Sequence, residues 1–170
     1  MNDTTITGSL EDSGQTLVLR RQFPDSPAVL WAALTDSETL GRWFGTWTGD
    51  PTSGTVAVTM NAEPGEAHAQ DYTVHRCLPE RELSVSSTSD FGTWRLTLRV
   101  ADHSSGSALE FRHEDIDHSA LAQIGPGWEW YLDRLAATLG DLPLPQLAEF
   151  EAAFAPQGEA YAALLPKTEG

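Results

Sequence analysis

The stretch HEDIDH, from His113 to His118, gathers the side chains that most often bind divalent metal ions. A zinc-binding helix of the His-Glu-x-x-His type places two histidines one turn apart on the same face. His113 and His118 are five positions apart, across what reads as a strand end and a helix start. Asp117 is better explained as a residue that caps that helix start, where free backbone amides favour a carboxylate. The sequence therefore predicts neither a metal site nor a cofactor.

Cys77 is the only cysteine, and strand alternation places it on the same strand face as His75. A cysteine beside a histidine can act as an activated nucleophile. The sequence offers no second cysteine to resolve a disulfide, and no further group completes a catalytic set. We therefore expect a structural thiol and predict no catalytic residue.

The run IGPGWEWYLDRLAATLG, residues 124–140, begins with a Gly-Pro-Gly sequence and continues as a helix. Its glycines lack the spacing of a P-loop or of a dinucleotide-binding turn, so a phosphate site is the weaker interpretation. We predict instead that Gly125 caps the helix and that Pro126 lies in its first turn. Gly127 would then let the helix start approach a strand closely.

The chain has 170 residues, the size of one domain, and a formal net charge of -15. Phosphate backbones and anionic membrane surfaces would repel so acidic a protein, so neither nucleic acid nor a membrane is an expected partner. The start MNDTTITGSLEDSGQ lacks the basic and apolar regions of a signal peptide. No apolar run approaches the roughly 20 residues of a membrane span. These features predict a cytoplasmic protein.

The remaining patterns predict an α+β domain. Alternating apolar residues predict a first strand over 15–23, and caps at Ser26 and Asp36 predict two short helices that end at Gly45. Five more segments have strand character and are separated by turn signals: 55–60, 69–77, 82–88, 93–100 and 108–114. With a long helix after them, this order favours one antiparallel sheet covered on one face.

The long helix carries apolar residues on two opposite faces. Trp128, Tyr131 and Leu135 belong to one stripe, which should face the sheet, while Trp130 and Ala137 point the other way. The segment 143–165 has apolar residues at helical spacing, and we predict that it folds back as one or two short helices that cover Trp130. The alternative is that these residues form a homodimer interface or dock onto a partner.

Three parts of the chain together resemble the SRPBCC, or START-like, superfamily: RQFPDSPAVLWAALTDSETLGRWFG, then LTLRV followed by LEFRHEDID, and IGPGWEWYLDRL. The resemblance covers residues 16–140 and points to the branch of activator of heat-shock protein 90 ATPase homologue 1-like proteins. It implies a helix-grip fold, in which a curved antiparallel sheet wraps around a long C-terminal helix. Many relatives hold an apolar small molecule in the cavity between them. We expect a flexible N-terminus over 1–14, a domain over 15–140 and a helical extension over 141–170 packed on the domain.

Strand alternation, together with the helical stripe, indicates which side chains line such a cavity. The expected ligand-binding residues are Arg21, Trp43, Trp94, Leu96, Phe111, His113, Trp128 and Tyr131. Arg21 and His113 would orient a ligand's carboxylate or carbonyl group if they point inward. Alternatively they lie at the rim, where Arg21 pairs with a carboxylate such as Asp115 and His113 is exposed. Trp43 is either a core plug or a mobile gate over the cavity.

Three classes of function fit this sequence. Binding of a hydrophobic or amphipathic small molecule is the interpretation that we favour. A chaperone cofactor is the second, although in the eukaryotic activators a further N-terminal domain carries its own ATPase-stimulating motif, and only about 15 residues precede the first strand here. A polyketide cyclase or aromatase-like enzyme is the third, and it would need an inward-facing acid, base or arginine. A fold alone does not decide among them.

Overall fold

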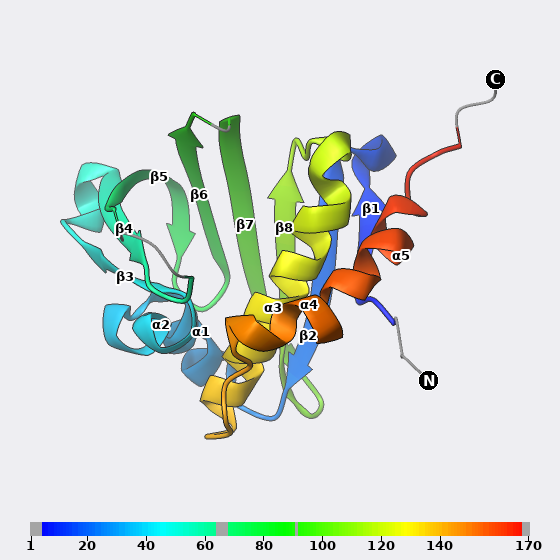
Figure 1. The fold of residues 1–170 in the computed structure, drawn as a ribbon. Coiled ribbons are helices and arrows are strands. Elements are labelled where there is room, and N and C mark those ends of the chain that lie inside the picture. Colours follow the sequence, from blue (N-terminus) through cyan, green and yellow to red (C-terminus); the bar gives the residue numbers. More distant parts are fainter. Residues whose placement is uncertain (1–4, 64–67, 91, 168–170) are drawn as a thin grey trace.

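The computed structural model describes residues 5–63, 68–90 and 92–167, which form an α+β domain with a helix-grip fold. Within these residues, eight antiparallel strands make one open sheet in the order β1-β2-β8-β7-β6-β5-β4-β3. Their bounds are β1 Gly8–Glu11, β2 Thr16–Phe23, β3 Gly45–Thr48, β4 Thr55–Met60, β5 Gln70–Leu78, β6 Glu82–Ser89, β7 Gly92–His103 and β8 Gly106–Glu114. The long helix α3, Leu121–Leu139, lies against the concave side of the sheet (Figure 1).

Strand β8 shows why the sheet has two different faces. Its residues alternate between buried and partly exposed along the whole strand, as a period of two requires. The buried members are Ser107, Leu109, Phe111 and His113, and the last three pair with Val100, Leu98 and Leu96 of β7. These side chains point toward α3, so the concave face supplies the core of the domain.

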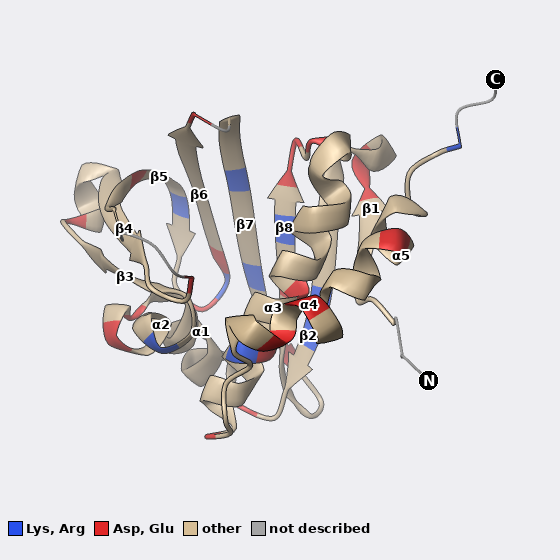
Figure 2. Cartoon of the chain, viewed as in Figure 1, with Lys and Arg blue, Asp and Glu red and all other residues tan. Residues whose placement is uncertain are grey.

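The outer face of the sheet carries a network of ion pairs. Glu110 lies within 3.2 Å of the guanidinium nitrogens of Arg20, Arg99 and Arg112, which come from β2, β7 and β8. Figure 2 shows basic residues along β7 and β8. Each exposed pair contributes little to stability. The network does, however, direct three basic groups of the sheet away from the concave side.

Two short helices close one end of the sheet: α1, Pro27–Thr35, and α2, Ser37–Trp43. The side chain of Ser26 accepts a hydrogen bond from the backbone of Val29, and the side chain of Asp36 accepts one from Glu38, so both predicted caps are present. Helix α2 ends at Trp43, two residues before the predicted stop at Gly45, and Gly45 instead begins β3, a strand that the sequence did not predict. Among the described residues, no helix is both long enough and apolar enough to cross a membrane.

Helix α3 begins earlier than its sequence suggested. Asp117 caps a 3-10 turn over His118–Ala120, and this turn continues directly into α3 at Leu121. Pro126 therefore lies inside the helix, and the prediction that Gly125 caps it is wrong. Because Pro126 has no N–H, the carbonyl four residues before it, that of Ala122, receives no helical hydrogen bond at this position.

The first residues of the chain also differ from the expectation of a flexible stretch over 1–14. Residues 1–4 lie outside the described part of the chain. Strand β1 pairs with β2 from Gly8 opposite Leu19 to Glu11 opposite Thr16, and a 3-10 turn over Asp12–Gly14 follows it. Backbone pairing orders this stretch although its sequence, GSLE, has no clear alternation of apolar and polar residues.

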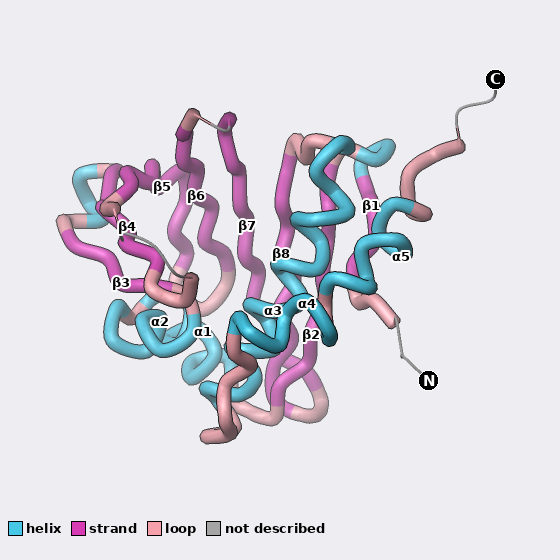
Figure 3. The backbone as a smooth tube through the Cα atoms, viewed as in Figure 1, coloured by secondary structure: helices cyan, strands magenta, loops and turns pink. Residues whose placement is uncertain are grey.

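The segment after α3 folds back along the side of α3 that faces away from the sheet (Figure 3). It contains short helical elements: Leu147–Glu149, α4 Phe150–Ala153, Ala155–Gln157 and α5 Gly158–Ala162. Trp130 is only 2% exposed, and its ring meets that of Phe150 edge to face, with centroids 6.3 Å apart. The ring of Tyr161 lies between Gly8 and Gly125, where an added Cβ on either glycine would overlap it. Tyr161 of the extension thus contacts both β1, at Gly8, and α3, at Gly125.

Candidate functional site

An apolar inner cavity of about 160 Å³ lies between the sheet, the α1–α2 pair and α3. Four of the expected residues line it: Trp43, Leu96, Phe111 and Trp128. Aliphatic side chains from β4, β5 and β6 complete its walls, among them Val58, Val74 and Val85. Apolar walls of this kind favour an apolar group over water.

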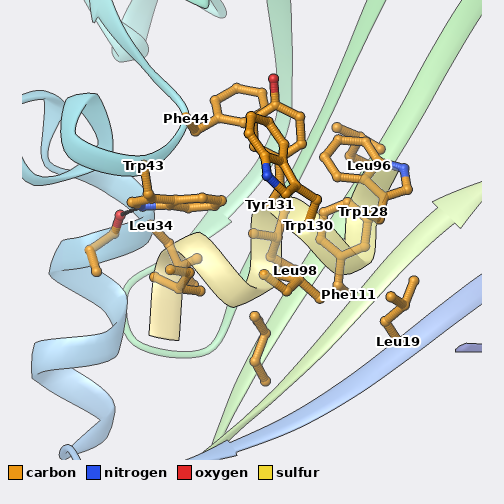
Figure 4. Close-up of a cluster of buried hydrophobic side chains, with 14 of the residues drawn as sticks. Leu19, Leu34, Trp43, Phe44, Leu96, Leu98, Phe111, Trp128, Trp130 and Tyr131 are labelled. Atoms are coloured by element: carbon orange, nitrogen blue, oxygen red, sulfur yellow. Dashed lines mark hydrogen bonds between the residues drawn. The ribbon is translucent and has the colours of Figure 1, made fainter. Parts of the chain in front are cut away.

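Trp43 forms the wall of the inner cavity at α2. Its ring is buried, and its indole Nε1 donates a hydrogen bond of 2.9 Å to the backbone carbonyl of Ala33. The next residue, Phe44, packs against Tyr131, with ring centroids 5.2 Å apart (Figure 4). The indole of Trp43 is therefore held by the burial of its ring and by the hydrogen bond of its N–H, as in a core plug. Its role as a gate stays a prediction.

A larger outer cavity of about 580 Å³ adjoins the first one. Its aromatic walls are Tyr72, Trp94, Trp128 and Tyr131, and its polar lining is Glu63, Gln70, Ser87, Ser89 and Gln123. Tyr72 and Trp128 line both cavities and so stand between them. The site thus combines a cavity with apolar walls and an adjoining cavity that adds polar groups to aromatic walls.

Trp128 is the centre of this arrangement. Its ring lies against Phe111 and Trp94, with centroid separations of 4.5 Å and 5.7 Å, and Figure 4 shows it between the helix and the strands. Its Nε1 donates a hydrogen bond of 3.0 Å to Nδ1 of His113. Burial lowers the pKa of His113 from 6.5 to about 4, so the imidazole is neutral and accepts this bond. His113 is 2% exposed, which excludes the alternative that it lies exposed at the rim; instead it fixes the orientation of Trp128.

Tyr131 joins α3 to the loop after β4. Its hydroxyl donates a hydrogen bond of 2.7 Å to Oε2 of Glu63. Burial raises the pKa of Tyr131, and the hydrogen bond to Glu63 and its negative charge raise that pKa further. The phenol therefore keeps its proton at neutral pH and acts as a donor rather than as a base.

Arg21 faces α3, as strand alternation predicted, but it is not among the described residues that line either cavity. Its Nη2 lies 2.6 Å from Glu129 and its Nη1 lies 2.6 Å from Asp133, one helical turn further along α3. The expected partner Asp115 instead lies 3.7 Å from Arg95. Because α3 turns an acidic edge toward β2, the guanidinium group is neutralised there. Arg21 thus joins β2 to α3, and its role in ligand binding stays a prediction.

Cys77 and His75 lie on opposite faces of β5, although alternation placed them together. A β-bulge between Val74 and Arg76 inserts one residue and reverses the parity. Cys77 consequently lines the inner cavity, whereas the ring of His75 contacts Ser86 at 2.6 Å. The two histidines of the HEDIDH stretch also lie apart. His113 is in β8 and points inward, whereas His118 begins the 3-10 turn before α3 and contacts the carbonyl of Gly14.

The polar part of the outer cavity was not predicted from the sequence. Glu63, Gln70 and Gln123 lie in no recognisable motif. Ser87 and Ser89 did carry a signal, because they share the strand parity of Leu83 and Val85. The inward face of β6 therefore changes from apolar side chains to hydroxyls along its length, as the lining of a cavity with a polar mouth would.

Comparisons with known proteins agree with this architecture. A family model described as activator of Hsp90 ATPase homolog 1-like protein matches residues 25–140. Among curated protein sequences, none matches the chain. The crystal structure of CalU16 from Micromonospora echinospora is similar, with a TM-score of 0.72 and 25% sequence identity over 94% of this chain and 95% of that chain.

Two further solved structures share the fold. The protein encoded by BPP1335 from Bordetella parapertussis has a TM-score of 0.72 and 18% identity, over 99% of this chain and 97% of that chain. DynU16, from the dynemicin biosynthetic locus, has a TM-score of 0.65 and 19% identity, over 74% of this chain and 47% of that chain. Identities this low establish likeness of fold alone.

Proposed function

The chain belongs to the family of activator of Hsp90 ATPase homolog 1-like proteins, and on that premise we propose that it binds an amphipathic small molecule. The apolar part of the ligand would occupy the inner cavity, and its polar part would lie in the outer cavity. One observation carries this proposal: Tyr72 and Trp128 line both cavities, so one molecule that spans them would have apolar walls around one end and polar groups near the other.

The size of the inner cavity limits the apolar part. A cavity of about 150 Å³ lined by aliphatic and aromatic side chains is large enough for benzene, and the inner cavity measures about 160 Å³. We therefore expect a single ring or a short branched chain to enter it. The aromatic walls at Phe111 and Trp128 favour a flat ring, because aromatic pairs add to the burial of apolar area.

The lining favours binding over turnover. Among the described residues that line the two cavities, Glu63 is the one carboxylate, and its Oε2 already accepts the Tyr131 hydrogen bond. Acid–base catalysis needs a group with a pKa near the working pH. Burial raises the pKa of both Tyr72 and Tyr131, and so keeps these phenols protonated.

A neutral fluorescent probe tests the proposal. N-phenyl-1-naphthylamine, which carries a single ring beside a double one, should bind the full chain saturably with increased fluorescence. Val85→Phe places a larger side chain in the inner cavity and should weaken probe binding by about tenfold or more.

Val29→Phe is the matched control, because Val29 is 48% exposed on α1 and does not line a cavity. It should bind the probe as the wild-type chain does. Circular dichroism and thermal unfolding of both variants show that they are folded. Absence of saturable binding to the wild-type chain, or equal binding by the Val85→Phe variant, would contradict the proposal.

A further inference from the structure

The outer cavity differs from most anion-binding sites in the charge of its lining. Glu63 is the one charged residue among the described residues that line it, and the remaining polar groups are neutral hydroxyls and amides. The whole chain has a formal net charge of -15. A ligand with a carboxylate or phosphate group would therefore enter against both the local and the overall field.

The basic residues nearest α3 are directed elsewhere. Arg21 is paired with Glu129 and Asp133 on the edge of α3 that faces β2. Arg134 donates hydrogen bonds to the backbone carbonyls of Trp43 and Pro145, and its guanidinium carbon lies 4.9 Å from the centroid of the Trp130 ring. Neither group is placed to compensate a buried anion in the outer cavity, where an unpaired charge is costly.

The aromatic walls favour the opposite charge. Trp94, Trp128 and Tyr131 present rings to the outer cavity, and the negative faces of such rings attract an ammonium group within about 6 Å of their centroids. Glu63 adds a full negative charge at the rim. A carboxylate has about four acceptor positions on its two oxygens, so Glu63 can hold the Tyr131 hydroxyl and still accept from a ligand.

From this combination we infer that the site takes an organic ammonium ion: an apolar ring for the inner cavity joined to a protonated amine that lies among the outer aromatic rings and pairs with Glu63. The inference rests on the proposed function, and it adds the charge of the ligand. Glu63 is then a specificity-determining residue, because it would discriminate between ligands of the same shape and different charge.

Three probes with one skeleton test the charge. We expect benzylamine, benzyl alcohol and phenylacetate, which share one phenylmethyl group, to displace bound N-phenyl-1-naphthylamine from the full chain in that order of affinity. The amine should bind about fivefold or more tighter than the alcohol, and the acid should bind weakest, as one ion pair at a partly solvated rim allows.

Glu63→Gln assigns the preference to a residue. The amide oxygen can still accept the Tyr131 hydrogen bond, so the variant should remain folded while the advantage of the amine over the alcohol falls to about twofold or less. Glu151→Gln removes the same charge from an exposed position on α4, outside both cavities. This control should keep the full preference for the amine.

The outcomes separate the two proposals. If the alcohol displaces the probe but the amine binds no better, the ammonium inference is overturned while the proposed function stands. A preference for the amine that survives in the Glu63→Gln variant would also overturn it, because the charge would then act from elsewhere. If the wild-type chain binds no probe at all, both proposals fail together.

Discussion

The two faces of α3 are packed in different ways, although their tryptophans are only two residues apart. Trp128 lines two cavities on the side of the sheet. Trp130 lies on the opposite side under α4 and is among the largest fully buried side chains. The glycines show the same contrast, because an added Cβ on Gly125 would overlap the ring of Tyr161, whereas one on Gly127 would meet no atom within 4 Å.

This difference indicates how the domain can keep unfilled space next to its central helix. Cavities weaken a fold because their walls lose packing contacts. On the packed face, buried Glu129 accepts hydrogen bonds from Thr7, Arg21 and Tyr161, which belong to three separate parts of the chain. The helix is therefore held in place by these contacts, and its position does not depend on filling the cavities on its other face.

Replacing each tryptophan by alanine gives the largest expected effect on this comparison. Trp130→Ala should lower the free energy of unfolding by about 4 kcal/mol, because its ring leaves a cavity in dense packing. Trp128→Ala should cost less, about 2 kcal/mol, because the space that its ring leaves joins the two cavities and water there can replace the indole N–H as the partner of His113. Urea denaturation of both variants measures the difference. Equal losses would mean that the two faces are packed alike.

Acid should destabilise the folded chain through His113, which contacts Trp128 on the cavity side of α3. Its pKa is about 4 in the folded chain and about 6.5 when unfolded, so between these values the unfolded chain binds a proton that the folded chain excludes. Stability should therefore fall as the pH drops from about 6.5 toward 4, by about 3 kcal/mol in total.

His113→Gln tests this pH dependence, because glutamine does not titrate but keeps an oxygen that accepts from Trp128. Urea denaturation at pH 7 and pH 4.5 should show a smaller acid loss in this variant than in the wild-type chain. Other carboxylates titrate in both proteins, so the difference between the two losses reports His113. Parallel pH profiles would show that His113 is not the source.

The two glycines of α3 give the smallest effects, with opposite signs. Gly125→Ala should cost about 1 to 2 kcal/mol, because its methyl group would displace the ring of Tyr161. Gly127→Ala should stabilise the chain by about 0.5 to 1 kcal/mol, as alanine is the better helix former and has room here. Thermal unfolding distinguishes them. A destabilising Gly127→Ala would show that the outer cavity is closed at this position.

The sequence was sufficient to predict which side chains of β7 and β8 point toward α3, because apolar residues alternate along both strands. It could not place Arg21, since strand parity assigns a face but not the side of the helix that the face meets. It also misassigned Cys77, because a bulge changes the parity without leaving a mark in the residue types. The outer cavity depends on Glu63 and Gln123, which are distant in sequence, and only the folded chain brings them together.

The pairing of β2 with β8 has a consequence for the order of events during synthesis. Leu17 lies opposite His113 in the sheet, and Tyr161 completes the contact between Gly8 and Gly125. A ribosome releases β2 long before any of its later neighbours exists. The central strand pairing must therefore wait until residue 113 has emerged, and the anchoring of α3 must wait until residue 161. Contacts so far apart along the chain make folding slow, so we expect the domain to acquire its native packing only after residue 161 has been synthesised.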